Sequence, residues 1–172
     1  MAILARISPL ADLFRPLRKK AIMRIADYLD SRLVTFLDAE ARDDAIDALI
    51  DLLDEEGKLP DIQAFRKAIF HREGLVSTGI GMGVAIPHAK MRDIREFFIA
   101  IGIQKKKGIE WNALDKAPVR IVFMIGGPDD KQSEYLQILS LLTSAIRDVD
   151  LRKNLLKAAD ADEVFELFSN SL

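Results

Sequence analysis

The chain has 172 residues, of which 49% are hydrophobic and 30% are charged, and its formal net charge at pH 7 is −2. A chain of this length fits one domain with a large core, and the absence of cysteine excludes thiol chemistry and thiolate metal sites. The balanced charge is unlike that of a nucleic-acid-binding domain, and no apolar run approaches the roughly 20 residues of a membrane span. We therefore expect a cytoplasmic globular protein without a membrane span.

Residues 1–22 form a basic segment that differs from the rest of the chain. One acid, Asp12, stands against five cations, which are Arg6, Arg15, Arg18, Lys19 and Lys20. Such an arm can associate with an acidic surface such as lipid headgroups, but short basic runs are more often only solvated. Alternatively, Met23 is the true translation start. We treat residues 1–22 as an N-terminal extension and residues 23–172 as the domain.

The first half of the domain predicts one strand and two helices. Residues 32–37 are β-branched and aromatic, which favours a strand. Residues 41–56 carry apolar side chains at helical spacing, and Gly57 follows at the position where glycine commonly ends a helix. Asp61 is a suitable N-cap for a second helix that runs toward His71, a residue that we expect to be structural or exposed.

The second half predicts strands followed by helices. Apolar, β-prone runs at 97–103 and 119–125 are the strand candidates, and the lysines at 105–107 form a solvated turn or protect a sheet edge. Acidic N-caps predict helices that begin after Asp129 or Asp130, after Asp148 and after Asp160. Strands interleaved with helices indicate an α/β fold around a small, largely buried sheet.

The segment from Arg72 to Lys90 combines the features of a chemical site. Glycines alternate at 79, 81 and 83, and such a loop can bend sharply and present backbone N–H groups to an anion. Residues 84–86 predict a short strand that is buried on both faces and that Pro87 ends, which leaves His88 at the strand end. A neutral imidazole there can act as nucleophile, general base or metal ligand, or it can be a half-buried structural residue.

The run Ser77-Thr78-Gly79-Ile80-Gly81-Met82-Gly83-Val84-Ala85-Ile86-Pro87-His88 resembles the phosphorylation-site motif of the mannitol/fructose/nitrogen-type enzyme IIA domains of the bacterial phosphotransferase system. The resemblance covers Met23 to Leu167 and implies the fold of that family, an α/β fold with a small mixed sheet flanked by helices. It implies that His88 accepts a phosphoryl group from a phosphohistidine of the carrier HPr or its nitrogen-branch counterpart. Because this donor is already activated, we expect no cofactor, metal ion or ATP at the site.

Further roles follow from the same resemblance. Arg72 matches the arginine that precedes the glycine loop and suits a phosphoryl group, or a carboxylate that orients the histidine, although it can also be an ordinary helix C-terminal cation. Ser77 and Thr78 either donate hydroxyl hydrogens to the phosphoryl oxygens or only form turn bonds. The supporting loop consists of Gly79, Gly81 and Gly83.

Tyr135 is the main departure from the family pattern. Members often carry a second active-site histidine in a Pro-(x)n-His-Leu-x-x-Leu segment, and here Pro128 leads to Tyr135-Leu136-Gln137-Ile138-Leu139. A tyrosine can donate a hydrogen bond but does not become cationic near neutral pH. Tyr135 therefore either holds the phosphoryl group less strongly than a histidine would or only packs in the core.

The resemblance implies two possible uses of the phosphoryl group. A transport subunit passes it to a IIB domain, whereas a nitrogen-type regulator changes its affinity for a target protein, and the absence of a fused IIB or IIC favours the regulator. The alternative is a regulatory protein-binding module that keeps the fold but has lost phosphotransfer. A metal hydrolase is disfavoured because His71 and His88 lack a ligand spacing, and nucleotide binding is disfavoured because no Gly-Lys-Ser/Thr follows the glycines.

Overall fold

The computed structural model of the protein describes residues 22–170, so nearly all of the predicted extension at 1–22 lies outside the described residues. Two short 3₁₀ turns, Ile25–Tyr28 and Ser31–Leu33, lead into the first strand. In chain order the strands and helices are then β1 (Val34–Leu37), α1 (Arg42–Glu55), α2 (Ile62–Leu75), β2 (Gly79–Gly81), β3 (Val84–Ala85), β4 (His88–Lys90), β5 (Phe98–Gln104), β6 (Ile121–Gly127), α3 (Gln132–Arg147), α4 (Val149–Lys157) and α5 (Ala161–Ser169).

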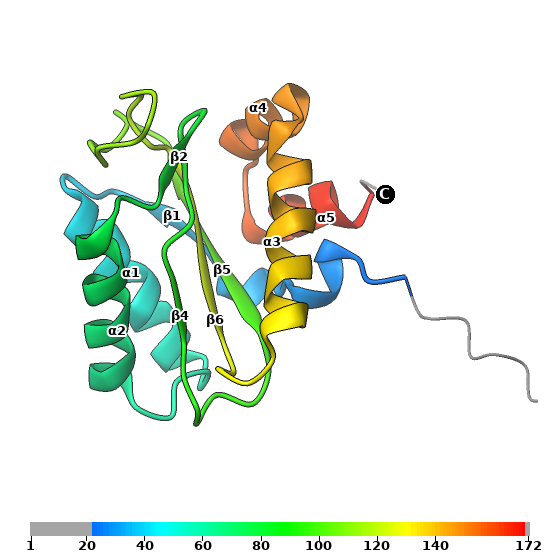
Figure 1. Ribbon diagram of the computed structural model, residues 1–172. Helices are drawn as coiled ribbons and strands as arrows, with labels where there is room; N and C mark the ends of the chain where they lie inside the picture. The colour runs from blue at the N-terminus through cyan, green and yellow to red at the C-terminus, as the bar shows by residue number, and fades with distance from the viewer. Residues whose placement is uncertain (1–21, 171–172) are drawn as a thin grey trace, which may run out of the picture.

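The sheet is mixed, with the strand order β1-β5-β6-β3-β2, and β4 also pairs with β6. β5 runs antiparallel to β6 and parallel to β1, whereas β3 and β4 both run parallel to β6. Helices α1 and α2 lie on one side of the sheet, and α3, α4 and α5 lie on the other (Figure 1). This arrangement confirms the small mixed sheet flanked by helices.

The two central strands are buried on both faces. Every residue of β5 and β6 is buried, which explains why both strands are continuous apolar runs in the sequence. Alternate side chains point into two cores, one against α1 and α2 and the other against the C-terminal helices. Strand β6 extends to Gly127, two residues beyond the predicted run at 119–125. Glycine fits at its last two positions because a Cβ there would overlap the rings of Phe98 and Phe97.

Ile86 and Pro87 separate two short strands, β3 and β4. β3 and β4 run along the same edge of β6, with Val84 opposite Ile121 and His88 opposite Ile125. The Pro87 carbonyl accepts from the Ile125 N–H at 3.0 Å, so the ladder continues past the residue that has no N–H of its own. The strand predicted at 84–86 ends at Ala85, before Pro87, and His88 is the first residue of the next strand, β4.

The helix starts follow the predicted caps in three places and depart from them in one. Asp61, Asp148 and Asp160 each accept hydrogen bonds from backbone N–H groups of the first turn of α2, α4 and α5. Helix α3, in contrast, begins at Gln132 after Lys131 and has no side-chain cap, so neither Asp129 nor Asp130 caps it.

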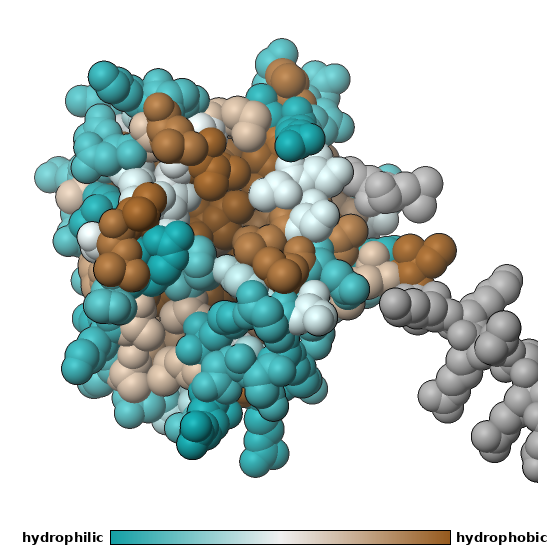
Figure 2. Space-filling view, viewed as in Figure 1, coloured by the Kyte–Doolittle hydropathy of each residue, from teal (hydrophilic) through white to brown (hydrophobic). Residues whose placement is uncertain are grey.

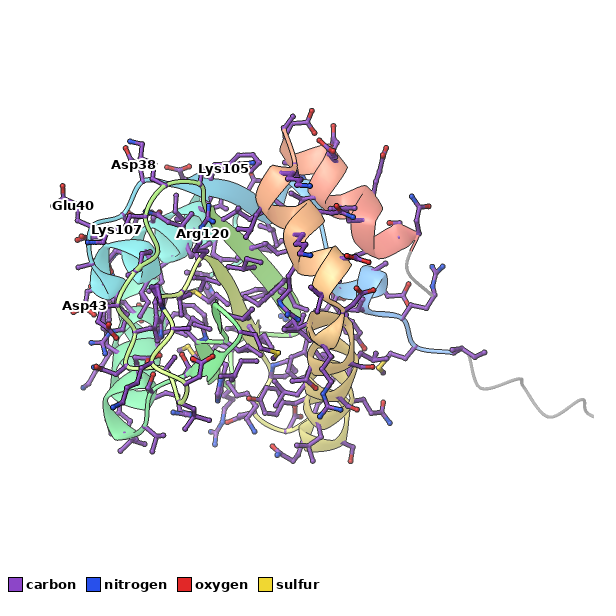
Figure 3. All side chains as sticks on the ribbon, turned by 90° about the horizontal axis from the view of Figure 1, so that it is seen from above. Asp38, Glu40, Asp43, Lys105, Lys107 and Arg120 are labelled. Atoms are coloured by element: carbon purple, nitrogen blue, oxygen red, sulfur yellow. The ribbon has the colours of Figure 1, made fainter. Side chains whose placement is uncertain are left out.

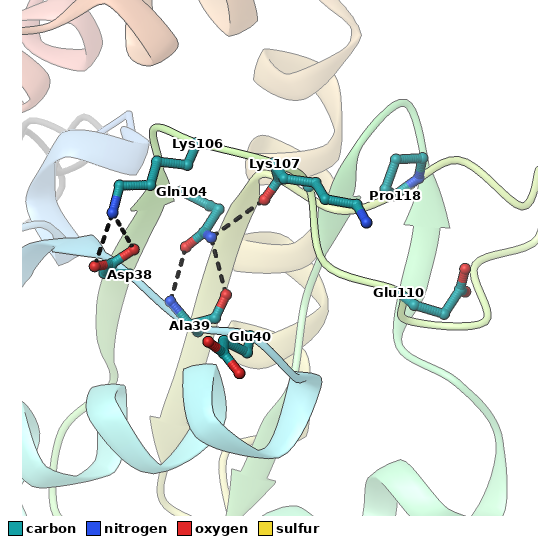
Figure 4. A pocket seen from close by; sticks show the side chains of 9 residues that line it. Asp38, Ala39, Glu40, Gln104, Lys106, Lys107, Glu110 and Pro118 are labelled. Carbon is teal, nitrogen blue, oxygen red and sulfur yellow. Dashed lines mark hydrogen bonds and ion pairs between the residues drawn. The ribbon is translucent and has the colours of Figure 1, made fainter.

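Gln104 closes the end of the sheet that lies away from His88. Its buried side chain accepts from the Ala39 N–H at 3.2 Å and donates to the carbonyl oxygens of Ala39 at 3.0 Å and Lys107 at 3.2 Å (Figure 4). Lys106 forms an ion pair with Asp38 at 2.8 Å beside these bonds. The lysine turn is therefore anchored to the segment after β1 rather than only solvated.

Candidate functional site

His88 is held at both ring nitrogens. Its Nδ1 lies 2.9 Å from the Ile86 carbonyl oxygen, and its Nε2 accepts from the Arg72 Nε–H at 3.1 Å. A carbonyl only accepts and a guanidinium only donates, so Nδ1 carries the proton and Nε2 carries the lone pair. The ring is half-buried at the start of β4, and its nucleophilic atom is therefore Nε2.

The surroundings of His88 keep the imidazole neutral. Burial lowers the pKa of His88 below the usual value, and the positive charges of Arg72 and Lys90 lower it further. The bond to Ile86 and the carboxylate of Glu73 act in the opposite direction but do not outweigh burial. A neutral ring with a lone pair on Nε2 is the form that can attack an electrophile.

Arg72 reaches His88 from the last turn of α2. Its Nη1 donates to the Val76 carbonyl oxygen at 2.8 Å, one residue beyond the end of the helix. This bond fixes the guanidinium while its Nε faces the histidine. The structure thus brings together Arg72 and His88, which are sixteen residues apart in the sequence.

A buried carboxylate organises the segment between α2 and β2. Glu73 is 3% exposed and accepts from the Thr78 N–H at 2.9 Å, from the Thr78 hydroxyl and from the Trp111 indole N–H at 3.1 Å. The three donors satisfy a charge that would otherwise be costly to bury. Glu73 therefore fixes the loop at 76–78 beside the neighbouring Arg72.

The two predicted hydroxyls are already engaged as donors. The Ser77 hydroxyl donates to the Trp111 carbonyl oxygen at 2.6 Å and accepts from the Gly79 N–H at 3.1 Å. Thr78 donates its hydroxyl hydrogen to Glu73. Each hydroxyl has one hydrogen, so both hydrogens are used within the protein in this structure.

Tyr135 lies against His88 from α3, with 5.7 Å between the ring centroids. Its ring also stacks on Phe97 with the centroids 6.2 Å apart, and the Lys90 ammonium lies 4.8 Å from its ring centroid. Burial raises the pKa of Tyr135 to about 12, so its hydroxyl remains protonated at neutral pH. Tyr135, which the resemblance aligns with a second histidine, is thus a neutral aromatic neighbour of His88.

The glycines divide between the site and a distant turn. Gly79 lies beside Ala113 and next to the pocket residues Thr78 and Ile80, whereas Gly81, Met82 and Gly83 form the β2–β3 turn with φ values of +95°, +59° and +74°. The Met82 N–H donates to the Asp115 carboxylate at 2.9 Å. Gly81 and Gly83 are not among the described residues that line the His88 pocket, and their positive φ values shape the turn of a hairpin.

A pocket of about 440 Å³ surrounds His88. Figure 2 shows apolar surface gathered in a hollow between the α2 side and the α3 side of the molecule. Leu75 and Val76 at the end of α2 are each 65% exposed, and Leu136 on α3 is 54% exposed. The described lining residues are Arg72, Ser77, Thr78, Ile80, Ile86, His88, Leu136, Leu139, Ser140 and Thr143.

Sequence reasoning assigned no role to Glu73, Lys90 or Trp111. The signal for Glu73 was its place beside Arg72, and the signal for Trp111 was that it is the single tryptophan of the chain. Lys90 shares the face of β4 with His88, as residues two apart on a strand do. Within residues 22–170 no cluster of histidine and carboxylate side chains could hold a metal ion.

The comparison with known protein families decides the identity of the chain. A family model described as "Phosphoenolpyruvate-dependent sugar phosphotransferase system, EIIA 2" matches residues 27–171. The chain belongs to this family. Among the described helices of this EIIA protein, none is long and apolar enough to cross a membrane.

Relatives of the EIIA chain include both sugar-specific and regulatory proteins. It is 34% identical over 148 residues to the fructose-specific EIIABC component of Bacillus subtilis, which covers 86% of this chain but 23% of that protein. It is 34% identical over 128 residues to the fructose-specific EIIA component of Haloferax volcanii, covering 74% and 82% of the two chains. The nitrogen regulatory protein of Escherichia coli is 29% identical over 127 residues, with coverages of 74% and 77%.

Solved structures show the same fold. Nitrogen regulatory protein IIA-Ntr from Neisseria meningitidis superposes with a TM-score of 0.76 at 26% identity, over 84% of this chain and 98% of that one. IIA mannitol from Escherichia coli gives a TM-score of 0.69 at 22% identity, over 81% and 97%. Another structure holds the mannitol IIA enzyme in complex with phosphorylated IIB and gives a TM-score of 0.70 at 20% identity, over 81% and 96%.

Proposed function

We propose that Nε2 of His88 accepts a phosphoryl group from the phosphohistidine of an HPr-like carrier protein. The chain then passes the group to a IIB domain or retains it as a regulatory mark. The observation that carries this proposal is the pair of hydrogen bonds at the His88 ring, because the Ile86 carbonyl holds the proton on Nδ1 and leaves the lone pair on Nε2, where it faces Arg72.

The proposed step exchanges one P–N bond for another. The Nε2 lone pair forms a bond to phosphorus while the bond between phosphorus and the donor imidazole breaks, and that electron pair returns to the donor ring. The proton on Nδ1 stays beside the Ile86 carbonyl, which accepts a stronger hydrogen bond as the ring gains positive character. Both bonds are similar in energy, so positioning and charge stabilisation are what the site must supply.

Arg72 has to change partners during this step. Its Nε–H occupies the Nε2 lone pair in the structure, and the same position is needed for phosphorus. The bond from Nη1 to Val76 keeps the guanidinium in place, so a small rotation can redirect the remaining N–H groups to the phosphoryl oxygens. The guanidinium would then stabilise the charge that it faces.

The surface around His88 suits a protein partner. Leu75, Val76 and Leu136 form an exposed apolar rim on both sides of the pocket, and such a patch on a protein surface marks an interaction site. A phosphoryl group on His88 would place nearly two negative charges within this rim. Phosphorylation would therefore change which partners the rim binds, as both the transport and the regulatory uses require.

Intact-mass spectrometry tests the proposal. The chain is incubated with phosphorylated HPr or with its phosphorylated nitrogen-branch counterpart, beside His88→Ala and the matched control His71→Ala, which removes the other histidine. We expect one acid-labile phosphoryl group on the wild type and on His71→Ala, and none on His88→Ala. No phosphoryl group from either donor would overturn the proposal and favour the alternative, a binding module that has lost phosphotransfer.

A chase experiment separates the two uses. Phosphorylated chain is mixed with IIB domains, and loss of its phosphoryl group is followed by mass. Rapid transfer to a IIB domain supports the transport use, whereas retention of the group with a changed affinity for a target protein supports the regulatory use. The fructose-specific and nitrogen-regulatory relatives are similarly close to this chain, at 34% and 29% identity, so sequence similarity does not choose between them.

A further inference from the structure

A second pocket lies between the β2–β3 turn and helix α4, at the opposite end of the β3–β4 edge from His88. It has a volume of about 250 Å³, and we call it the α4 pocket. Gly83 in its wall precedes His88 by five residues of mostly extended chain, which corresponds to roughly 16 Å. The described residues that line it are Met82, Gly83, Pro118, Arg120, Ile121, Val149, Arg152, Lys153 and Leu156, and the His88 pocket shares none of them.

The charges of the α4 pocket all have one sign. Arg120, Arg152 and Lys153 line it, and its described lining residues include no aspartate or glutamate. Within residues 22–170 none of these three cations forms an ion pair. The nearby Asp148 is engaged as the cap of α4, where it accepts from the Asp150 and Leu151 N–H groups.

Two of the cations are held in place by carbonyl groups instead of carboxylates. Arg120 donates from Nε to the Gln104 carbonyl oxygen at 3.2 Å and from Nη2 to the Lys105 carbonyl oxygen at 2.7 Å. Arg152 donates from Nη1 to the Ile146 carbonyl oxygen. A carbonyl orients a guanidinium without neutralising it, so each side chain keeps its full charge and further N–H donors for an anion.

The remaining wall of the pocket is apolar. Met82 and Val149 are 43% and 49% exposed, and they stand on the β2–β3 turn and on the first residue of α4. Gly81 and Gly83 at positive φ and the bond from the Met82 N–H to Asp115 fix the turn that carries this methionine. The pocket therefore combines a cationic end with an apolar wall.

A larger hollow at this end of the molecule is lined by charges of both signs. It has a volume of about 660 Å³, and its lining contains Lys106 and Lys107 together with Asp38, Glu40 and Glu110 (Figure 4). Figure 3 shows Asp38 and Glu40 beside Lys107 over the α1 side, whereas Arg120 lies toward the helices on the other face. The α4 pocket is thus the more distinctly cationic of the two.

We propose that the α4 pocket binds a small phosphate monoester. The phosphate would contact the guanidinium groups of Arg120 and Arg152 and the ammonium of Lys153, and the carbon skeleton would lie against Met82 and Val149. Planar guanidinium groups match the oxygens of a phosphate, and the volume is below the roughly 300–1,000 Å³ of pockets for drug-sized ligands. This site is independent of phosphoryl transfer at His88.

Amide chemical shifts in the full chain test this proposal with phenyl phosphate as the probe. Inorganic phosphate and phenol are compared with phenyl phosphate, because the first carries only the phosphate group and the second only the aromatic ring. We expect phenyl phosphate to shift the amides of Gly83, Val149 and Lys153 in a saturable manner and to bind more tightly than either compound. Arg152→Gln and Lys153→Gln should each weaken binding about tenfold, the loss expected for one charge-assisted hydrogen bond.

Two controls make the result specific. Lys157→Gln removes an exposed cation from the same helix outside the pocket, and it should leave binding unchanged. A His88→Gln chain is titrated in parallel, because the probe can also enter the phosphoryl site near Arg72. Shifts confined to the surroundings of His88, or an equal loss of binding in Lys157→Gln, would overturn the proposal.

Discussion

His88 illustrates how two hydrogen bonds define the chemistry of one side chain. Because burial lowers its pKa, the imidazole stays neutral to a lower pH than a histidine in solution, whose pKa is about 6.5. We expect the rate of phosphoryl acceptance to remain high as the pH falls through this value and to decline only when the folded ring takes up a proton. The measurement is the rate against pH, with the His88 ring titrated by NMR. A decline centred at or above the solution value would contradict the prediction.

Arg72 acts through the geometry of its fork as well as through its charge. Arg72→Lys retains the positive charge. The guanidinium, however, uses separate nitrogens to bind the Val76 carbonyl and to face His88, and a lysine has a single ammonium nitrogen. We expect Arg72→Lys to accept the phosphoryl group about 100-fold more slowly, the usual loss of one transition-state donor. Arg66→Lys on the same helix is the control. Equal rates for both variants would show that the fork has no role.

Tyr135 is where the sequence departs from the motif that it resembles, and the structure places its ring beside that of His88. Tyr135→His would introduce a side chain that can become cationic near the phosphoryl group, so we expect faster acceptance from the carrier. Tyr135→Phe keeps the ring and its packing on Phe97 and should change the rate little. Quenched-flow phosphorylation of the three chains measures this. If Tyr135→His matched the wild type, the residue would have only a packing role.

At the level of elements, the sequence best predicts the helix ends that are set by neighbouring residues. An aspartate accepts bonds from the N–H groups of the next turn, so Asp61 and Asp160 locate helix starts without knowledge of the rest of the fold. Gly57 at φ +68° ends α1 by an equally local rule. Helix α3 follows no such rule, because packing of its apolar stripe on the sheet stabilises it without a cap.

Long-range pairings could not be obtained in this way. The resemblance of the motif to a known family predicts a shared site for Arg72 and His88. No such signal predicts the buried bonds from Trp111 to Glu73 and Thr78, which join residues that are 38 and 33 positions apart. The formation of a further strand, β4, after Pro87 likewise depends on the neighbouring β6. Such features depend on which strands become neighbours, and a local pattern does not contain that information.

Two glycines test the packing of β6 and α2. A Cβ at Gly127 would overlap the ring of Phe97, which stacks on Tyr135, so Gly127→Ala should lower the free energy of unfolding by about 1–3 kcal/mol. At Gly74 in α2 nothing lies within 4 Å of the position that an alanine methyl group would occupy. Gly74→Ala should therefore raise the free energy of unfolding by roughly 0.5–1 kcal/mol. Urea denaturation measures both changes. Equal effects of the two substitutions would contradict this account.

At the scale of the whole molecule, one sheet joins the two cores. β5 and β6 contribute side chains to both sides, so neither helical layer can unfold without exposing the strands that support the other. We therefore expect the domain to unfold in a single two-state transition, with equal calorimetric and van't Hoff enthalpies. A calorimetric enthalpy well above the van't Hoff value would indicate that one layer unfolds independently.

Trp111 gives the molecule a built-in optical reporter. It is the single indole of the chain, and its N–H is bonded to the carboxylate of Glu73, whose neighbour in sequence is the arginine that holds His88. Movement of Arg72 toward a phosphoryl group would alter the electric field at the indole, and the emission wavelength of tryptophan responds to that field. On the proposed function, the arrival and departure of the phosphoryl group would change the emission of the unlabelled protein, and this change could be followed in real time in mixtures with partners that lack tryptophan.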